Sequence, residues 1–389
     1  MALTTDERVA SAPRVIDTPI ISSDSHITEP GWTYVDNIDP AFRDRAPFLT
    51  DDDPDGATFH VPGMSYKIHL GLHSAAGRAD DALAMKGTHF DELHRAGWDP
   101  AARVEAQEAD GIDAEVIYPS VGMILCNHPD LDLKKAMLDA YNRWIADYCS
   151  HAPNRLLGLG QTALRTPEEG IADLEAMAAA GLRGVMLPLT PGPAYDDGPD
   201  YDDPVYDDLY RACIDLGLVP SFHILTGKSY KPRGPKLNNF MSIIRGNQDL
   251  IGTFVFGGVF DRVPDLKIVC VEADAGWIPH FSYRMDHAYH RHRNWLGGPV
   301  RLERKPSDYV DDHVYLTFQD DWSAFRMAEA GLINPARLLW ANDYPHSDST
   351  WPYSQGMLAD QTADLSPEAT AAILGGNAVE LYGLQGLYD

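Results

Sequence analysis

The chain has 389 residues, of which 44% are apolar and 23% charged, as in a globular protein with a sizeable core. Its formal net charge of −27 at pH 7 argues against nucleic acids and anionic membrane surfaces as partners, because both require clustered Lys and Arg. The sequence has no apolar run long enough to span a membrane, and its four scattered cysteines lack metal-binding spacing. We therefore expect a cytoplasmic protein that acts on a small molecule.

The N-terminal part of the chain divides into three segments. Residues 1–18 are polar and of mixed charge, and we predict a flexible arm that precedes one domain over 19–389. A first strand is predicted at 19–26. The stretch of about 30–102 has poor periodicity apart from an alternation at 58–70, so we interpret it as a long insertion with a small hairpin. Long loops in compact domains are usually functional, which makes the insertion a candidate lid.

From residue 103 onward, helical segments alternate with short apolar runs. The runs predict strands at 113–120, 156–164, 184–188, 218–225, 266–274, 314–320 and 338–345, and helices are predicted at 131–149, 167–180, 204–216 and 277–295. Eight strands alternating with helices predict the α/β class and a (β/α)₈ TIM barrel. A doubly wound open sheet is the alternative, but it would not bring its first and last strand ends together.

Polar side chains stand at the C-terminal ends of several predicted strands, where barrels carry their functional groups. Asp24 and His26 are two residues apart on the first strand and so share one face. His223 and Asp343 end two later strands, and a carboxylate after a buried run is costly unless it is paired or metal-bound. This nitrogen and oxygen set predicts one or two divalent ions, with zinc or iron favoured and manganese as an alternative.

Three further residues are candidates for the same centre. Glu272 ends the strand at 266–274 and could be a metal ligand or a general base, or else form a structural ion pair with Arg284. Glu29 follows His26 by three residues and is a further candidate ligand, the alternative being a solvated loop carboxylate. His346 follows Asp343 by three residues and could either support a metal ligand or donate a proton.

Several motifs together resemble the amidohydrolase-related family. They are Asp24-Ser-His26-Ile-Thr-Glu29-Pro, Phe222-His223, Val263-Pro-Asp-Leu-Lys-Ile with Glu272-Ala-Asp-Ala-Gly-Trp-Ile-Pro, Asp343-Tyr-Pro-His346-Ser-Asp-Ser-Thr-Trp and Ile373-Leu-Gly-Gly-Asn377-Ala. The resemblance covers about 19–385 and is to the branch with aminocarboxymuconate semialdehyde and resorcylate decarboxylases. It implies a (β/α)₈ barrel and at least one divalent metal. The family's metal ligands fall on Asp24, His26, His223 and Asp343.

Two departures from this family lead to our functional prediction. The decarboxylases have a histidine where this chain has Glu272, and first-strand ligands of the form His-x-His rather than Asp24-x-His26. More carboxylate oxygen favours a metal-activated water. We therefore predict a metal-dependent hydrolase that cleaves the C–N, C–O or C–S acyl bond of an amide, ester, lactone or thioester, with Glu272, Asp343 and His346 as catalytic residues.

The alternatives remain open at this point. The first is a metal-dependent non-oxidative decarboxylase (a lyase) or hydratase of an aromatic or unsaturated acid, with Arg103 binding the carboxylate. Trp351 and Tyr353 follow the last strand and are candidates to contact the flat part of a substrate, or else only pack the loop. A remote alternative is an inactive binding protein on the same scaffold. Barrels of this kind are often dimers, so we also consider a homodimer.

Overall fold

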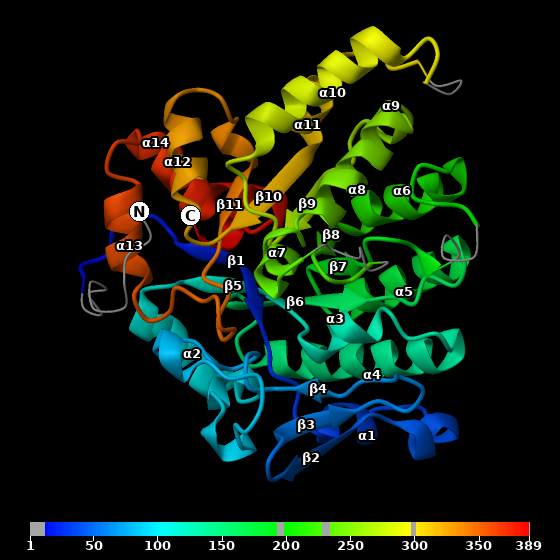
Figure 1. The fold of residues 1–389 in the computed structure, drawn as a ribbon, viewed down its shortest axis with the longest axis vertical. Helices are drawn as coiled ribbons and strands as arrows, with labels where there is room; N and C mark the ends of the chain where they lie inside the picture. Colours follow the sequence, from blue (N-terminus) through cyan, green and yellow to red (C-terminus); the bar gives the residue numbers. More distant parts are fainter. Residues whose placement is uncertain (1–11, 193–197, 228–233, 297–300, 389) are drawn as a thin grey trace.

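The barrel predicted from the sequence is confirmed. The computed structural model describes residues 12–192, 198–227, 234–296 and 301–388, and Figure 1 shows parallel strands surrounded by helices. The eight strands of the barrel sheet, in spatial order, are β1 (Ile21–His26), β5 (Ala114–Tyr118), β6 (Leu156–Gln161), β7 (Gly184–Leu187), β8 (Val219–His223), β9 (Ile268–Val271), β10 (Val314–Phe318) and β11 (Leu338–Trp340). Most of the predicted N-terminal arm, residues 1–11, lies outside the described residues.

The barrel closes where its first strand meets its last. The N–H of His26 donates to the carbonyl of Tyr344 at 2.7 Å, and the N–H of Asp343 donates to the carbonyl of Asp24 at 3.0 Å. These bonds join the C-terminal end of β1 to the residues that follow β11. Closure therefore places groups from opposite ends of the sequence at the same mouth.

Helices follow most strands, and residues at the helix ends determine where the helices begin and end. Asp130 accepts backbone N–H groups at the start of α4, and Gly217 ends α6 in the left-handed conformation that glycine adopts without strain. The helices are α1 (Trp32–Val35), α2 (Pro100–Asp110), α3 (Val121–Leu125), α4 (Leu131–Ser150), α5 (Pro167–Ala179), α6 (Asp207–Leu216), α7 (Lys236–Met241), α8 (Arg245–Phe256), α9 (Val259–Arg262), α10 (Ile278–His292), α11 (Pro306–His313), α12 (Trp322–Glu329), α13 (Ser354–Gln361), α14 (Pro367–Ala371) and α15 (Asn377–Leu381). In the described ranges, no helix is long and apolar enough to cross a membrane.

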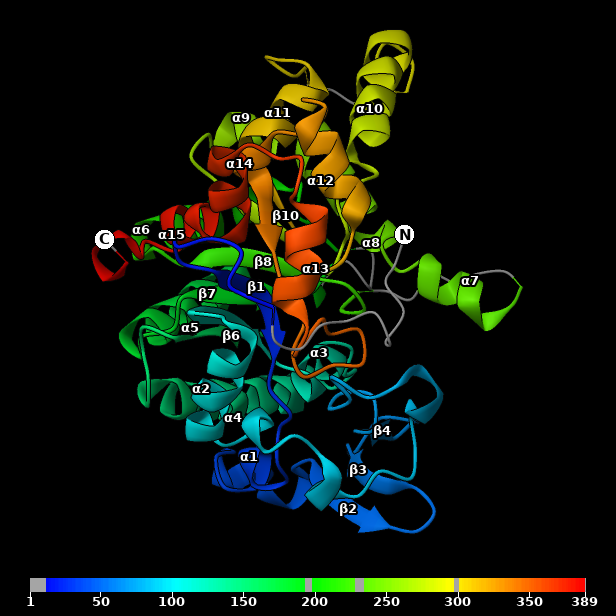
Figure 2. The same ribbon diagram turned by 90° about the vertical axis from the view of Figure 1, so that its left-hand side faces the viewer.

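The insertion after β1 forms a small antiparallel sheet, which includes the predicted hairpin. Its strands are β2 (Phe48–Asp52), β3 (Gly56–His60) and β4 (Ile68–His69), and Figure 2 shows them beyond the end of β1. The insertion also contacts the loop after β11: Ala75 and Ala76 donate to the carbonyl of Pro345, and Ser347 donates to the carbonyl of Leu72. It therefore borders the barrel mouth, while its role as a lid stays a prediction.

The barrel interior is filled by side chains below the mouth. Residues from different strands meet there, among them Val116, Leu159, Met186 and Val269, and Tyr382 after α15 packs against the same cluster. This packing excludes a pore. The polar groups at the strand ends therefore lie on an apolar floor, where charges are poorly solvated.

Candidate metal centre

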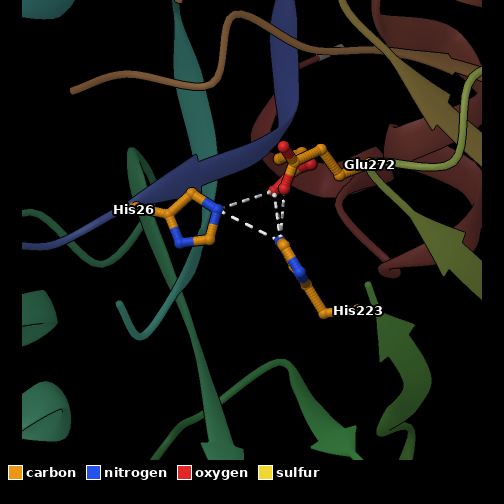
Figure 3. A group of neighbouring side chains, drawn as sticks. His26, His223 and Glu272 are labelled. Carbon is orange, nitrogen blue, oxygen red and sulfur yellow. Dashed lines mark hydrogen bonds and ion pairs between the residues drawn. The ribbon is translucent and has the colours of Figure 1, made fainter. Parts of the chain in front are cut away.

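Two histidines and a carboxylate from β1 and β8 meet at the barrel mouth. His26 Nε2 lies 3.2 Å from His223 Nε2, and Asp24 Oδ1 lies 3.3 Å from the first and 3.7 Å from the second. All three side chains are fully buried. Figure 3 shows a ring nitrogen of His26 and one of His223 facing each other, with Glu272 beside them. Asp24 and His26 thus share one face of β1, as predicted.

Two more carboxylates flank this group. Glu272, directly after β9, places Oε2 3.5 Å from His223 Nε2, and Asp343, after β11, places Oδ1 3.5 Å from His26 Nε2. Both have left-handed backbone conformations, with φ of 54° and 51°. Non-glycine residues rarely adopt this conformation, and such strain is concentrated at functional sites. It turns each carboxylate toward the mouth at the point where its strand ends.

The orientation of the two imidazoles leaves both Nε2 atoms free for a ligand. His26 Nδ1 donates to the carbonyl of Pro119 at 2.9 Å, and His223 Nδ1 donates to the carbonyl of Ile224 at 3.1 Å. In the neutral rings, Nε2 then carries a lone pair and no proton. Two lone pairs 3.2 Å apart repel unless a cation or a proton lies between them. Backbone bonds of this kind orient metal-binding histidines in general.

Three carboxylate oxygens of the centre also lack hydrogen-bond partners within the described residues. Within the described residues, neither oxygen of Asp343 accepts a hydrogen bond, nor does Oδ1 of Asp24. Burial, followed by the charges of Glu272 and Asp24, raises the pKa of Asp343 well above its ordinary value. Burial raises the pKa of Glu272 to about 8. For Asp24 burial acts in the same direction, but contacts with His223 and His26 outweigh it and lower the pKa.

These residues fit a divalent metal ion. Buried carboxylates and imidazoles without hydrogen-bond partners are costly, and a cation would neutralise the carboxylates and accept both Nε2 lone pairs. Mixed nitrogen and oxygen ligands suit zinc, iron or manganese. Two ligand groups meet the distance requirements for an ion, one with Asp24, His26, His223 and Glu272 and one with His26, Asp343 and His346. Because His26 belongs to both and has one free nitrogen, the geometry favours a single ion.

His346 lies on the other side of His26. Its ring stacks on the His26 ring at 3.8 Å between centroids, and its Nδ1 is 3.3 Å from Asp343 Oδ1. The hydroxyl of Ser120 is 2.7 Å from Nε2 of the same ring. The ring centroid of His73, from the insertion, lies 5.5 Å from that of His346. Burial lowers the pKa of His73 to about 4.

The structure does not bring Glu29 and Arg103 into the ligand group. Glu29 accepts the backbone N–H groups of Ser120, Val121 and Gly122 at the start of α3, so its oxygens are occupied. Arg103 is fully buried and donates to Glu115 and to backbone carbonyls at the ends of β1 and β11. Its guanidinium is therefore not available to a substrate carboxylate.

The two aromatic candidates lie in the segment between β11 and α13. Trp351 donates from its indole N–H to the carbonyl of Ala106 on α2 and packs against Tyr344 and His94. These contacts indicate a packing role. Tyr353 precedes α13 and is partly buried.

One residue near the centre, Ser120, was missed by the sequence analysis. Ser120 is the last residue of the predicted strand at 113–120, so it had the same strand-end signal as His223. His73 lies in the insertion, whose histidines the sequence made candidates to face the pocket without a strand-end signal.

The chain is similar to one family model and to several known proteins. The amidohydrolase family model matches residues 66–384. The 2-amino-3-carboxymuconate-6-semialdehyde decarboxylase of Dictyostelium discoideum is 25% identical over 320 residues, covering 78% of this chain and 81% of that protein. The structure of an amidohydrolase from Mycobacterium avium subsp. paratuberculosis has a TM-score of 0.76 at 17% identity, covering 95% of this chain and 100% of that one.

A further solved structure with the same fold contains a metal. It is 5-carboxyvanillate decarboxylase from Novosphingobium aromaticivorans in complex with manganese and 4-hydroxy-3-methoxy-5-nitrobenzoic acid. Its TM-score is 0.67 at 18% identity, and the match covers 94% of this chain and 96% of that one.

Proposed function

Because this chain belongs to the amidohydrolase family, we propose that it is a metal-dependent, non-oxidative decarboxylase of a small aromatic or unsaturated acid. The observation that carries the proposal is the buried pair of Nε2 atoms, 3.2 Å apart, beside oxygens of Asp24 and Asp343 that accept no hydrogen bond within the described residues. Such a cluster is suited to a cation. Decarboxylation is supported by the relatives, because the Dictyostelium discoideum protein and the manganese-containing Novosphingobium aromaticivorans protein are both decarboxylases.

This conclusion corrects the prediction of a hydrolase. That prediction rested on Glu272 replacing the histidine of the resembling decarboxylases and on the Asp-x-His form of the first-strand ligands. The relatives named above contradict it.

We propose that Asp24, His26, His223 and Asp343 hold the ion. Manganese is our choice of metal, because the related 5-carboxyvanillate decarboxylase contains it and carboxylate oxygens suit a hard cation. When bound, the ion supplies positive charge that holds an oxygen-rich acid against the site.

We assign the proton donor to Glu272. Its side chain is 16% exposed, whereas those of the four proposed ligands are fully buried. It is therefore the group of the cluster that an entering substrate meets first. Its position beside His223 places it next to the ion without requiring it as a ligand.

The reaction then balances with one proton. Glu272 gives a proton to the carbon that bears the carboxylate, and a C–H bond forms. The bond between that carbon and the carboxyl group breaks, its electron pair returns to the substrate carbon, and carbon dioxide leaves. Glu272 regains its proton from solvent, so each turnover consumes one substrate carboxylate and one proton.

The test is carbon dioxide release by the manganese-loaded protein. The panel contains 5-carboxyvanillate, 2,6-dihydroxybenzoate and 2-amino-3-carboxymuconate-6-semialdehyde, the acids after which the relatives are named. We expect release from at least one acid of this class, and a fall of ~10²–10⁴ in Glu272→Gln with bound manganese retained. Glu329→Gln, an exposed change on α12, is the matched control.

Two outcomes would contradict parts of this proposal. If the manganese-loaded protein released no carbon dioxide from any acid of the panel, the decarboxylase assignment would fail. If Glu272→Gln lost its manganese, Glu272 would be a ligand rather than the proton donor.

A further inference from the structure

Ser120 makes two short hydrogen bonds that together determine where its proton lies. Its Oγ is 2.6 Å from the carbonyl oxygen of Ile27 and 2.7 Å from His346 Nε2. A hydroxyl has one hydrogen, and a carbonyl oxygen can only accept. The hydrogen of Ser120 therefore points to Ile27. It follows that His346 Nε2 carries its own hydrogen and donates it to Ser120 Oγ.

This arrangement leaves Nδ1 as the basic nitrogen of His346. That atom is 3.3 Å from Asp343 Oδ1, and the ring is held flat against His26, with an interplanar angle of 16°. The order of contacts, Ser120 to His346 to Asp343, matches a Ser-His-Asp triad, but the proton runs the opposite way. In a triad the histidine takes the serine proton, whereas here the serine accepts from the histidine. Ser120 is therefore placed to orient the ring and not to act as a nucleophile.

Glu29 holds Ser120 in position. Its carboxylate accepts the N–H groups of Ser120 at 3.3 Å and of Val121 and Gly122 at 2.9 Å each, and the hydroxyl of Tyr34 at 3.4 Å. These bonds tie the loop after β1 to the start of α3. The carboxylate expected to be a ligand thus fixes the residue that orients His346.

We propose that Ser120 and Glu29 are positioning residues that hold His346 with hydrogen on Nε2 and with Nδ1 facing Asp343. The inference rests on the proposed function in one respect: the oriented ring packs flat on His26 and faces Asp343, both proposed ligands, so its misorientation should slow the proposed decarboxylation. The His346 side chain is 13% exposed and Asp343 is fully buried, so His346 lies on the solvent side of that carboxylate.

The tautomer can be measured without any substrate. Protein carrying ¹⁵N-labelled histidine and loaded with zinc, which is diamagnetic, gives side-chain NMR signals that distinguish protonated from unprotonated ring nitrogens. The His346 signal is the one missing in His346→Gln. We expect hydrogen on Nε2 in the wild type, mixed tautomers in Ser120→Ala, and the wild-type pattern restored in Ser120→Thr, which keeps the hydroxyl.

The matched control is Ser307→Ala. Ser307 is a buried serine on α11 whose hydroxyl binds Asp286, so it loses a similar hydrogen bond elsewhere in the fold. With the manganese-loaded protein, kcat should fall ~10–100-fold in Ser120→Ala, the usual effect of losing a partner that orients a ligand or proton carrier. KM and metal content should stay near wild type, and Ser307→Ala should change neither kcat nor the His346 signal.

A wild-type signal with hydrogen on Nδ1 would overturn the inference, and it needs no folded variant. An unchanged tautomer in a folded Ser120→Ala would overturn it as well. Hydrogen on Nε2 in a protein that decarboxylates no acid would support the positioning of His346 and contradict only the proposed function.

Discussion

The metal centre and the seam that closes the barrel are both buried, polar and built on β1, yet they are completed differently. In the seam, Arg103 donates to Glu115 at 2.6 Å, to the carbonyl of His26 at 2.6 Å and to the carbonyl of Tyr344 at 3.1 Å. In the centre, neither oxygen of Asp343 accepts a hydrogen bond within the described residues.

The difference separates scaffold from site. Buried polar groups that find their partners inside the protein rigidify the structure. Groups that lack them need a ligand, or remain as a cost that function requires. We therefore expect substitutions in the two regions to change stability in opposite directions when no metal is present.

The largest effect is expected from Asp343→Asn. It removes a proposed ligand, so turnover in the carbon dioxide assay should fall by ~10²–10⁴. In metal-free protein the same change removes a buried carboxyl group whose ionisation is disfavoured by burial and by Glu272 and Asp24, so the free energy of unfolding should rise. Chemical denaturation in the presence of a chelator measures this, with Asp360→Asn, exposed on α13, as the control. If Asp343→Asn destabilised the metal-free protein, the expected difference in sign between the centre and the seam would be wrong.

Arg103→Met should have the opposite effect on stability. It leaves Glu115 as a buried charge without its ion pair, which typically costs about 3–5 kcal/mol. The comparison is Arg95→Met, because Arg95 pairs with Asp99 while its side chain is 75% exposed, and such pairs contribute about 0–1 kcal/mol. Urea denaturation of both variants measures the difference. If both variants lost the same free energy of unfolding, the buried ion pair of Arg103 would contribute no more to stability than the exposed pair of Arg95.

The same contrast explains what the sequence could predict. Asp24, His26, His223, Glu272 and Asp343 were found because each stands at the end of an apolar run, and a barrel brings strand ends together. Both signals are local or follow from the fold class. The helix limits were also close, since α4 begins at the predicted Leu131.

The roles of Glu29 and Arg103 were not readable because their partners are distant in sequence. Glu29 binds backbone N–H groups 91 to 93 residues further on, and Arg103 reaches a carbonyl 241 residues away. No sequence pattern near either residue indicates these contacts. The reaction class was mispredicted because two local departures, Glu272 and the Asp24-x-His26 pair, were given more weight than the resemblance over the rest of the chain.

Metal addition should stabilise the centre and leave the seam unchanged. Binding to the folded state alone adds about 2.7 kcal/mol when the free metal is at 100 times its Kd. Thermal unfolding of chelator-treated protein across a manganese titration should therefore show a rising Tm. The rise should be lost in Asp24→Asn, which removes a ligand, and kept in Asp360→Asn. A Tm independent of manganese in the wild type would contradict the metal assignment.

The smallest effect is a pH dependence that arises in the seam. Burial raises the pKa of Asp110 to about 7, although hydrogen bonds from Ser354 and Asn342 act in the opposite direction. The folded protein therefore binds this proton more tightly than the unfolded chain does, so the contribution to stability is full below about pH 4 and is lost as pH rises through about 7. In Asp110→Asn the free energy of unfolding should fall less steeply over that range, by at most about 1.4 kcal/mol per pH unit. Denaturation at several pH values with a chelator present measures the slope, and the slope rather than the absolute stability is decisive because asparagine also changes the hydrogen bonding. If Asp110→Asn and wild type gave parallel curves, Asp110 would be ionised in the folded protein. The seam would then contain a charge that Ser354 and Asn342 are sufficient to stabilise.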